Sequence, residues 1–380
     1  MRNKNILFVV PMLDTEGPSY GRDDLYNNWN DLLAAMRDMT ERFRLERRDR
    51  SGQPMRFSWF ILDWVGYRED DPSYAKRKQV SGFHQILDRY RTNVLSDATL
   101  AKSGDGLYWH YHHPPKDGSW GWNRNWGDSR WYEAVLNKKI LERNFFSSVF
   151  RAGGYVEDDA ASGWLERFIP FDYSNNSPAV KEGAYDWSRA PRDWLPYHPA
   201  ANDYQSKGAM RRVIVRGLPV AAKGGSNTLT ERDVVLAFEL AAAGKQPILS
   251  YVTHDYYKSA MEEFALAHRF LEKVAKKFPT VHWEYRNALD AVRESLSLRS
   301  PPRLSLTVTK NKAKEFTIQA NHQVFGGMPY VAVRYEDGRE ERVDVTKREE
   351  GSWQYNGQEA VAAIGTAAND AFGNTAIAVL

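Results

Sequence analysis

The amino-acid sequence predicts an α/β fold, a (β/α) barrel of about seven strands with some distortion, followed by a small antiparallel β-sandwich. Through residue 298, short apolar runs alternate with longer segments of helical periodicity. Several of the runs are apolar throughout, which is typical of parallel strands buried on both faces. From residue 303 onward, short alternating runs separated by turn signals such as Asp337-Gly338 replace that pattern. We therefore expect a barrel domain over residues 1–298 and a sandwich domain over residues 303–380.

The elements of the barrel follow in order from the apolar pattern. Strands are expected at residues 5–13, 57–65, 107–113, 147–150, 170–173, 212–220, 246–253 and 281–285. Helices are expected at residues 26–43, 79–94, 131–143, 159–168, 230–243, 260–277 and 287–296. A long polar and aromatic stretch, residues 174–210, interrupts this alternation. The sandwich strands are expected at residues 304–308, 316–320, 330–335, 341–345 and 375–379.

Composition excludes several classes of function. Lys and Arg total 52 against 49 Asp and Glu, a net charge of +3, so no global field favours nucleic acid or an anionic membrane. The densest basic run, residues 42–50, contains acids as well and is expected to be a solvated face. Absence of cysteine excludes disulfides and thiolate chemistry. The apolar run at residues 6–13 is too short to span a membrane, so we expect a cytoplasmic protein without a transmembrane segment.

Three histidines lie close together in the stretch 107–114, L-Y-W-H-Y-H-H-P. In a strand, side chains alternate between faces, so His110 and His112 share one face, whereas His113 points to the other face or begins the next loop. Two imidazoles on one face suit zinc, iron or nickel, provided that oxygen ligands come from elsewhere. The alternative is a structural cluster in which the histidines and their aromatic neighbours pack and hydrogen-bond.

Polar residues also follow the other predicted strands. Asp14 and Glu16 stand two residues apart at the end of the first strand, so one carboxylate can bind a cation while the other acts as a general base. Arg151, before two glycines, can hold a neighbouring carboxylate, although a structural salt bridge is the alternative. His254 can protonate a leaving group, with Asp255 beside it. Carboxyl ends of barrel strands meet at one face, so we expect these groups to converge there.

Candidates for substrate contact come from two places. The long stretch 174–210 contributes Tyr197, His198 and Asp203 as substrate contacts or part of a lid, with a purely structural loop as the alternative. Aromatic faces suit the apolar faces of sugar rings, although aromatic residues also form protein cores. The predicted substrate-binding set is completed by Trp109, Tyr155 and Asp255.

The order of these motifs resembles the polysaccharide deacetylase superfamily, the NodB-homology domain of family four carbohydrate esterases, over residues 5–296. The resemblance rests on D-T-E at 14–16, the histidine stretch, F-R-A-G-G-Y at 150–155, W-L-E-R at 164–167, F-D-Y-S at 171–174 and T-H-D at 253–255. It implies a catalytic base at Asp14, a metal ligand at Glu16, and further ligands at His110 and either His112 or His113.

The resemblance also implies that Arg151 orients Asp14 and that His254 is the general acid. The family usually has adjacent aspartates and two histidines four residues apart, whereas this chain has D-x-E and H-Y-H-H. Which of the two carboxylates binds the metal therefore stays open, as does the second histidine.

The expected function is that of a metal-dependent hydrolase that removes an acyl group from an amino sugar or glycan. The acyl group is expected to be N-acetyl. Its cofactor is expected to be a divalent metal ion. Zinc is the first candidate, and cobalt, nickel and iron are the alternatives. A glycoside hydrolase on a related barrel is a second hypothesis, which requires another acid such as Asp63 or Asp255. A non-catalytic glycan-binding protein is a third.

Overall fold

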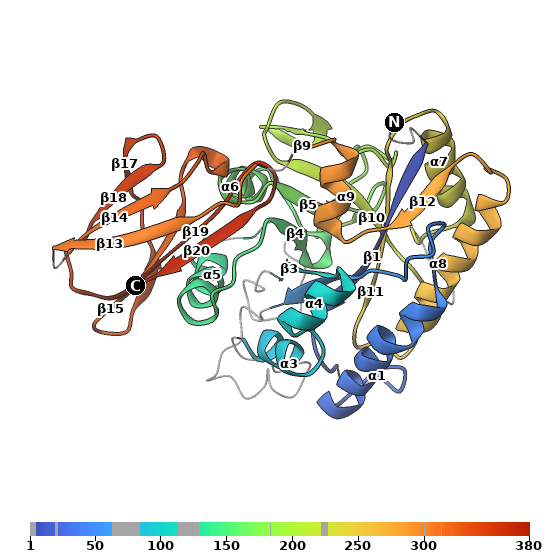
Figure 1. Cartoon of the computed structure of the whole chain (residues 1–380), viewed down its shortest axis with the longest axis horizontal. Helices are drawn as coiled ribbons and strands as arrows, with labels where there is room; N and C mark the ends of the chain where they lie inside the picture. Colours follow the sequence, from blue (N-terminus) through green and yellow to red (C-terminus); the bar gives the residue numbers. More distant parts are fainter. Residues whose placement is uncertain are drawn as a thin grey trace.

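Seven parallel strands form a closed barrel in the computed structural model (Figure 1). The structure describes residues 5–19, 22–62, 84–112, 126, 129–182, 184–221, 227–299, 301–312 and 314–380. The barrel strands are β1 (Ile6–Thr15), β2 (Ser58–Leu62), β3 (Gly106–Tyr111), β4 (Val149–Ala152), β5 (Phe171–Asn175), β10 (Val213–Pro219) and β11 (Ile248–His254). Pairing of β1 with β11 closes the barrel. An eighth strand, β12 (His282–Tyr285), pairs with the first half of β1, and β2 pairs with the second half. The predicted fold class is confirmed.

Helices surround the barrel between the strands. They are α1 (Trp29–Glu41), α3 (Gln85–Asn93), α4 (Asp97–Ser103), α5 (Ser129–Arg143), α6 (Asp159–Phe168), α7 (Glu231–Ala242), α8 (Ala260–Ala275) and α9 (Ala288–Ser295), with 3-10 turns η1 (Phe43–Glu46) and η2 (Gly153–Tyr155). Local sequence fixes several helix starts. Thr230 forms a capping box with Asp233 at the start of α7. The sequence pattern did not indicate α4.

The barrel interior is apolar at one end and closed there. Inward-facing side chains such as Phe8, Val10 and Met12 pack against Ala288 and Val292 of α9. Helix α9 therefore seals the end of the barrel at which the strands begin. The outward-facing side chains of the strands belong to a second core shared with the surrounding helices. At the carboxyl ends of the strands, the described residues include two partly exposed side chains, His112 and His254.

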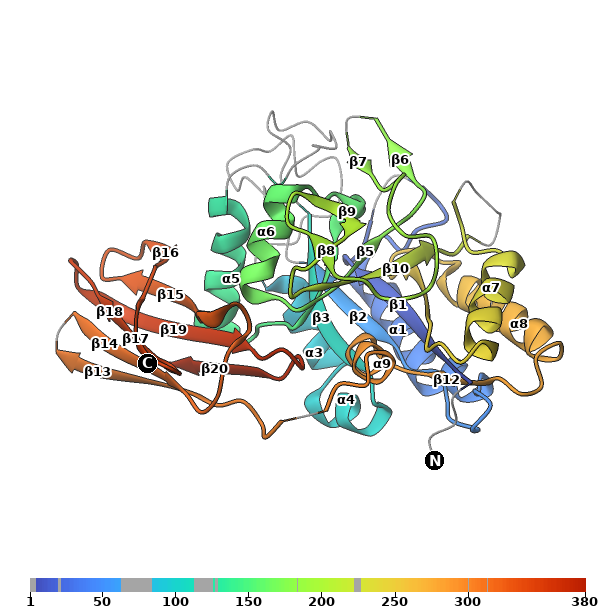
Figure 2. The same ribbon diagram turned by 90° about the horizontal axis from the view of Figure 1, so that it is seen from above.

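The long stretch before β10 contains two small hairpins, so it is not structureless. One hairpin pairs β6 (Val180–Lys181) with β7 (Tyr185–Asp186), and the other pairs β8 (Pro199–Ala200) with β9 (Asp203–Lys207). They share a small core that includes Trp187, Tyr197 and Tyr204. Figure 2 shows both hairpins on the same side of the molecule as the carboxyl end of β5.

The C-terminal residues form two four-stranded antiparallel sheets that face each other. One contains β13 (Leu306–Lys312), β14 (Glu315–Ala320), β18 (Ser352–Asn356) and β17 (Thr346–Glu349). The other contains β16 (Glu340–Arg342), β15 (Tyr330–Tyr335), β19 (Val361–Asn369) and β20 (Thr375–Val379). Their shared core includes Ile318, Val333, Trp353 and Ile364. The sequence pattern did not indicate β17, β18 or β19.

The sandwich docks on the barrel through α5 and α6, which lie between them in Figures 1 and 2. The Tyr330 hydroxyl donates to Asn137 Oδ1 at 2.9 Å, and Arg342 pairs with Glu133 at 2.8 Å. Asn369 is buried, and its Nδ2 donates to the carbonyl oxygens of Ser147 and Phe168 at 2.9 and 2.8 Å. These contacts join the two domains through polar groups that docking removes from solvent.

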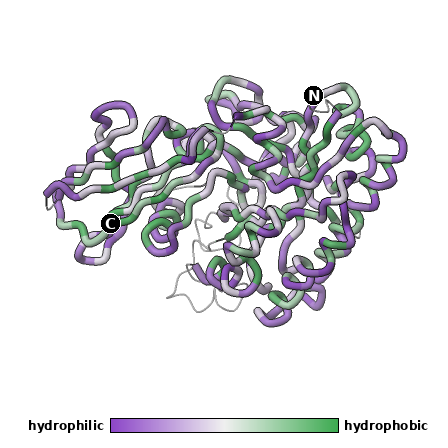
Figure 3. Tube along the Cα trace, in the orientation of Figure 1, coloured by the Kyte–Doolittle hydropathy of each residue, from purple (hydrophilic) through white to green (hydrophobic). Residues whose placement is uncertain are grey.

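Figure 3 shows hydrophilic residues along the outer helix turns and at the far hairpins of the sandwich. Within the described ranges, no helix has the length and apolar character needed to cross a membrane.

Replacing Asn369 with alanine should destabilise the docked molecule. The substitution leaves two buried carbonyl oxygens without donors, and we expect the free energy of unfolding to fall by about 2–4 kcal/mol. Urea denaturation followed by tryptophan fluorescence measures this change. Asn311→Ala, at an exposed asparagine of the sandwich, is the control and should change the free energy by less than about 0.5 kcal/mol. An unchanged midpoint for Asn369→Ala would show that these hydrogen bonds do not hold the interface.

Candidate metal centre and active site

Polar side chains replace the apolar interior residues at the carboxyl ends of the strands. In β1, inward-facing Met12 is followed two residues later by Asp14; in β3, Tyr108 is followed by His110. The strand registers set Asp14 beside His254 and His110 beside Arg151. Closure of the barrel therefore brings these strand-end residues together, as predicted.

Two histidines of the predicted metal site point at one carboxylate oxygen. Glu16 Oε1 lies 3.2 Å from His112 Nε2 and 3.5 Å from His110 Nε2. The three ligand atoms all lie within 4.8 Å of one another. Glu16 and His110 are buried, whereas the His112 side chain is 23% exposed. The predicted ligand His113 lies outside the described residues, so of the two candidates His112 is the one seen at the cluster.

The protonation of His110 follows from its second nitrogen. His110 Nδ1 lies 2.9 Å from the Arg151 carbonyl oxygen, which can only accept, so Nδ1 carries the proton. In the neutral ring Nε2 then bears a lone pair. This buried Nε2 has no hydrogen-bond partner among the described residues. A lone pair that faces the Glu16 carboxylate without a proton between them calls for a cation.

The spacing of these atoms suits a tetrahedral ion. Two ligands that each lie about 2.1 Å from a zinc ion at the tetrahedral angle are about 3.4 Å apart. The two distances from Glu16 Oε1, 3.2 and 3.5 Å, lie on either side of that value. Glu16, His110 and His112 therefore fit a divalent metal. Burial acts to raise the pKa of Glu16, but the charge of His112 holds it well below its ordinary value, which keeps the ligand ionised.

Asp14 is held as a carboxylate beside this cluster. Arg151 Nε donates to Oδ1 and Oδ2 of Asp14 at 2.8 and 3.1 Å. Burial acts to raise the pKa of Asp14, but the charge of Arg151, with His110, brings it below its ordinary value. The guanidinium of Arg151 lies over the ring of Tyr155, 4.5 Å from its centroid, and this contact fixes its orientation.

His254 lies close to both carboxylates. Its Nε2 lies 3.9 Å from Asp14 Oδ2 and 3.6 Å from Glu16 Oε1. Burial lowers the pKa of His254, although both carboxylates act in the opposite direction, so the imidazole is neutral at pH 7. The His254 side chain is 27% exposed. His112 and His254 thus give the cluster its contact with solvent.

Asp255 positions the end of β1 and does not face the site. Its two carboxylate oxygens accept the backbone N–H groups of Glu16 and Gly17, each at 3.0 Å, and the Tyr90 hydroxyl at 2.6 Å. Burial raises the pKa of Asp255 to about 7, although the hydrogen bond from Tyr90 acts to lower it. Asp255, predicted as a substrate contact, has no exposed surface.

Other predicted substrate contacts also lie away from the cluster. Trp109 faces outward from β3 and is buried among Trp126, Phe150 and Trp164. Tyr197 is buried in the core of the two hairpins, where its hydroxyl donates to the Tyr204 carbonyl. These two side chains present no surface to a substrate, which corrects the prediction for them.

His198 and Asp203 belong to the second hairpin. His198 Nδ1 lies 2.9 Å from the Met210 carbonyl oxygen, and Asp203 pairs with Arg189 at 2.7 Å. Their contacts among the described residues are thus local to the hairpin and its flanking segments. Of the predicted substrate-binding set, Tyr155 adjoins the site through Arg151, and Asp255 adjoins it through the backbone of Glu16.

Sequence reasoning missed Tyr90. This residue lies on the buried face of α3, where its apolar ring matches the helical pattern and nothing marks its hydroxyl as functional. Only the folded chain brings it to Asp255, 165 positions away.

Comparisons with known proteins add little to this description. No family model and no curated protein matches the chain. An engineered protein solved as a Northeast Structural Genomics Consortium target is 11% identical, with 92% of this chain and 69% of that chain covered and a TM-score of 0.21. A double mutant of Cellulomonas fimi endo-β-1,4-mannanase is also 11% identical, with 92% and 68% covered and a TM-score of 0.22. Similarity this weak carries no conclusion, so the chemistry rests on the site itself.

The cluster should bind one divalent ion per chain. Isothermal titration of the metal-free protein with zinc should give a stoichiometry of one, and His112→Ala should weaken binding by about a hundredfold or more because it removes a ligand. His282→Ala is the matched control, since His282 also faces a carboxylate, Glu284 at 3.0 Å, but at the far end of the barrel. Equal affinities for the wild type and His112→Ala would exclude this cluster as the zinc site.

Asp255→Ala should weaken the same site without removing a ligand. Loss of the carboxylate leaves two buried N–H groups and one hydroxyl without acceptors, and we expect the free energy of unfolding to fall by about 2–4 kcal/mol. Zinc affinity should also fall, because the Glu16 backbone is no longer fixed. Denaturation and zinc titration of the same preparation measure both effects. A destabilised variant with wild-type zinc affinity would show that Asp255 does not position Glu16.

Proposed function

We propose that this barrel is a metal-dependent hydrolase that removes an acyl group, most simply N-acetyl, from an amino sugar or glycan. The observation that carries the proposal is the convergence of Glu16, His110 and His112 beside an ionised Asp14 at the open end of the barrel. Three side chains that can bind a metal and a separate carboxylate base are the groups that metal-dependent hydrolysis of an amide uses. The motif resemblance to polysaccharide deacetylases supports the substrate class.

Glu16, His110 and His112 would hold the metal. A divalent cation bound there, zinc or alternatively cobalt, nickel or iron, supplies a Lewis acid that polarises the acyl carbonyl and lowers the pKa of water. The protein contributes a buried carboxylate whose low pKa keeps it ionised, and an imidazole whose tautomer is fixed by the Arg151 carbonyl.

Asp14 is suited to take the proton from the attacking water. It is ionised, and Arg151 holds one of its edges through two hydrogen bonds. The same ion pair limits the basicity of Asp14, since it favours the charged form. Arg151 therefore acts as a positioning residue that keeps the base deprotonated and correctly turned.

His254 is suited to protonate the departing amine. Its Nε2 lies 3.9 Å from Oδ2 of Asp14, and the His254 side chain is 27% exposed to solvent. Because His254 is neutral beforehand, the proton that Asp14 removes from water has an acceptor close by. Delivery of this proton to the amine nitrogen completes the reaction: water and an amide yield a carboxylic acid and an amine.

Aromatic side chains lie beside the general acid. The rings of Tyr256 and Tyr257 are centred 4.9 and 5.3 Å from the His254 ring, and both are partly exposed. Flat, partly exposed rings suit the apolar face of a sugar. They support a carbohydrate as the carrier of the acyl group.

The glycoside hydrolase hypothesis requires two carboxyl groups that flank a glycosidic bond. Asp255 does not suit that role, because its oxygens accept three hydrogen bonds from the protein. Asp63, the other candidate, lies outside the described residues.

Asp14→Asn should abolish acyl release but retain metal. The amide has nearly the same shape but cannot accept the proton, so the rate should fall by about 10²- to 10⁴-fold. The measurement is acetate release from N-acetylglucosamine and its oligomers with zinc, cobalt or nickel. Asp88→Asn is the control: Asp88 forms a similar pair with Arg143, at 2.7 Å between helices, and the rate should be unchanged.

Two results would argue against the hydrolase. If the wild type releases no acetate with any of the three metals while both proteins bind the glycan, the non-catalytic glycan-binding hypothesis is preferred. If Asp14→Asn is as active as the wild type, Asp14 is not the base.

A further inference from the structure

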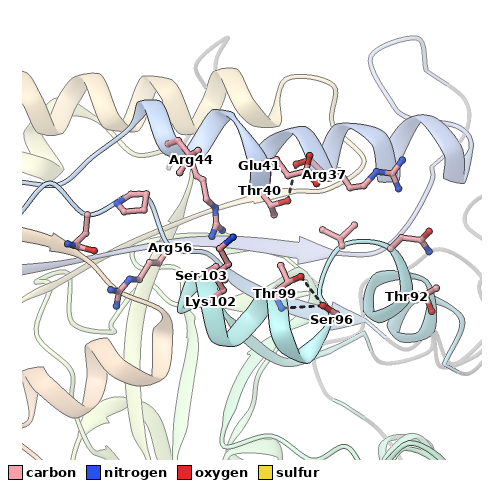
Figure 4. Close-up of a pocket in the computed structure, with 15 residues that line it drawn as sticks. Arg37, Thr40, Glu41, Arg44, Arg56, Thr92, Ser96, Thr99, Lys102 and Ser103 are labelled. Atoms are coloured by element: carbon pink, nitrogen blue, oxygen red, sulfur yellow. Dashed lines mark hydrogen bonds between the residues drawn. The ribbon is translucent and has the colours of Figure 1, made fainter.

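A basic groove lies at the other end of the barrel from the metal cluster. It has a volume of about 620 Å³ and runs between α1 and η1 on one side and α4 on the other (Figure 4). Arg56 and Ser103 line it just before β2 and β3 begin, so it adjoins the amino ends of these strands. Helix α9 and the filled barrel interior separate this groove from the site at the carboxyl ends.

The groove carries an excess of positive charge. Its cationic side chains are Arg37, Arg44, Arg56 and Lys102, against a single lining carboxylate, Glu41. Figure 4 shows Arg44, Arg56 and Lys102 at the same end of the groove, although they come from three separate segments. Within the described ranges, Arg56 and Lys102 make no ion pair. A charge excess of this kind in a concave surface attracts anions.

Arg44 is fixed in place and incompletely satisfied. Its side chain is 5% exposed, and its Nη2 donates to Asp105 Oδ2 at 2.5 Å. Asp105 is itself held by the Phe57 backbone N–H and by Trp59 Nε1, at 2.9 and 3.0 Å. Arg44 Nε is buried without an acceptor among the described residues. A preorganised guanidinium with an unused donor is a common element of oxyanion sites.

The remainder of the groove carries hydroxyl groups beside one charge of each sign, Arg37 and Glu41. Thr92, Ser96 and Thr99 line it away from Arg44, Arg56 and Lys102, and Arg37 lies at the same end as Thr92 in Figure 4. Leu45, one of the few large apolar side chains that are exposed, lies on the wall and is 48% exposed. The volume exceeds that of a single oxyanion and falls in the range of small-molecule sites. The ligand that these features suit has a phosphate at one end and a hydroxylated carbon skeleton at the other.

We propose that this groove binds the phosphate ester of a small hydroxylated compound, a sugar phosphate in its simplest form. The phosphate lies among Arg44, Arg56 and Lys102, and the sugar extends along Leu45 toward the hydroxyl-lined end. This site is independent of the proposed hydrolase activity, because no residue is shared between them.

Calorimetric titration with glucose 6-phosphate, inorganic phosphate and glucose tests the proposal. Glucose 6-phosphate should bind more tightly than phosphate, glucose should not bind, and affinity should fall as salt is raised. Arg56→Gln and Lys102→Gln should each weaken glucose 6-phosphate binding by about tenfold. Lys245→Gln, at an exposed lysine outside the groove, should leave it unchanged.

Three outcomes would overturn the proposal. The first is that neither phosphate compound binds. The second is that both groove variants bind glucose 6-phosphate as tightly as the wild type and have intact circular dichroism spectra. The third is that Asp14→Asn loses glucose 6-phosphate binding. The last result would place the phosphate at the catalytic end of the barrel. Since Lys102 is exposed on α4, its replacement tests the groove without a risk to folding.

Discussion

Closure of the barrel between β1 and β11 is the constraint on which the candidate site depends. These strands are separated by more than 230 residues of chain, yet their register sets Asp14 beside His254. The junction is then reinforced just beyond the strands, where the Asp255 backbone N–H donates to the Asp14 carbonyl at 3.1 Å and its side chain binds the amides of Glu16 and Gly17. The base, the metal-binding carboxylate and the general acid thus owe their relative positions to one strand pair.

Charge is the second constraint. Two carboxylates, Asp14 and Glu16, are buried within a few ångströms of the same histidines, an arrangement that repulsion and loss of hydration would ordinarily oppose. Arg151 compensates the first carboxylate through direct hydrogen bonds. Among the described residues, the second carboxylate is surrounded by imidazoles, and the proton on Nδ1 of His110 leaves a lone pair on Nε2 directed toward it. A bound cation would complete this balance, and in that sense the metal belongs to the stability of the site as well as to its chemistry.

The sequence could predict the parts of this arrangement that follow from strand periodicity. Alternation placed His110 and His112 on one face, and the end of an apolar run placed Asp14 and Glu16 at the open end of the barrel. The same alternation puts Trp109 on the face opposite His110, so the expectation that Trp109 lies near substrate did not follow the strand pattern, and its side chain packs against helices. Contacts between distant segments were also beyond reach. The hydrogen bond from Tyr90 to Asp255, and the burial of Arg44 within a basic run expected to be solvated, depend on the folded chain.

In the C-terminal domain, β17 is fully exposed and β19 consists mostly of small residues, so neither has the apolar alternation by which strands are recognised.

The account as a whole depends on a single ion at the open end of the barrel. Anomalous diffraction at the zinc absorption edge, from crystals grown with zinc, tests it most directly. We predict one strong peak between Glu16 Oε1, His110 Nε2 and His112 Nε2. A map with no peak at that position, or with the zinc bound only elsewhere, would contradict the account.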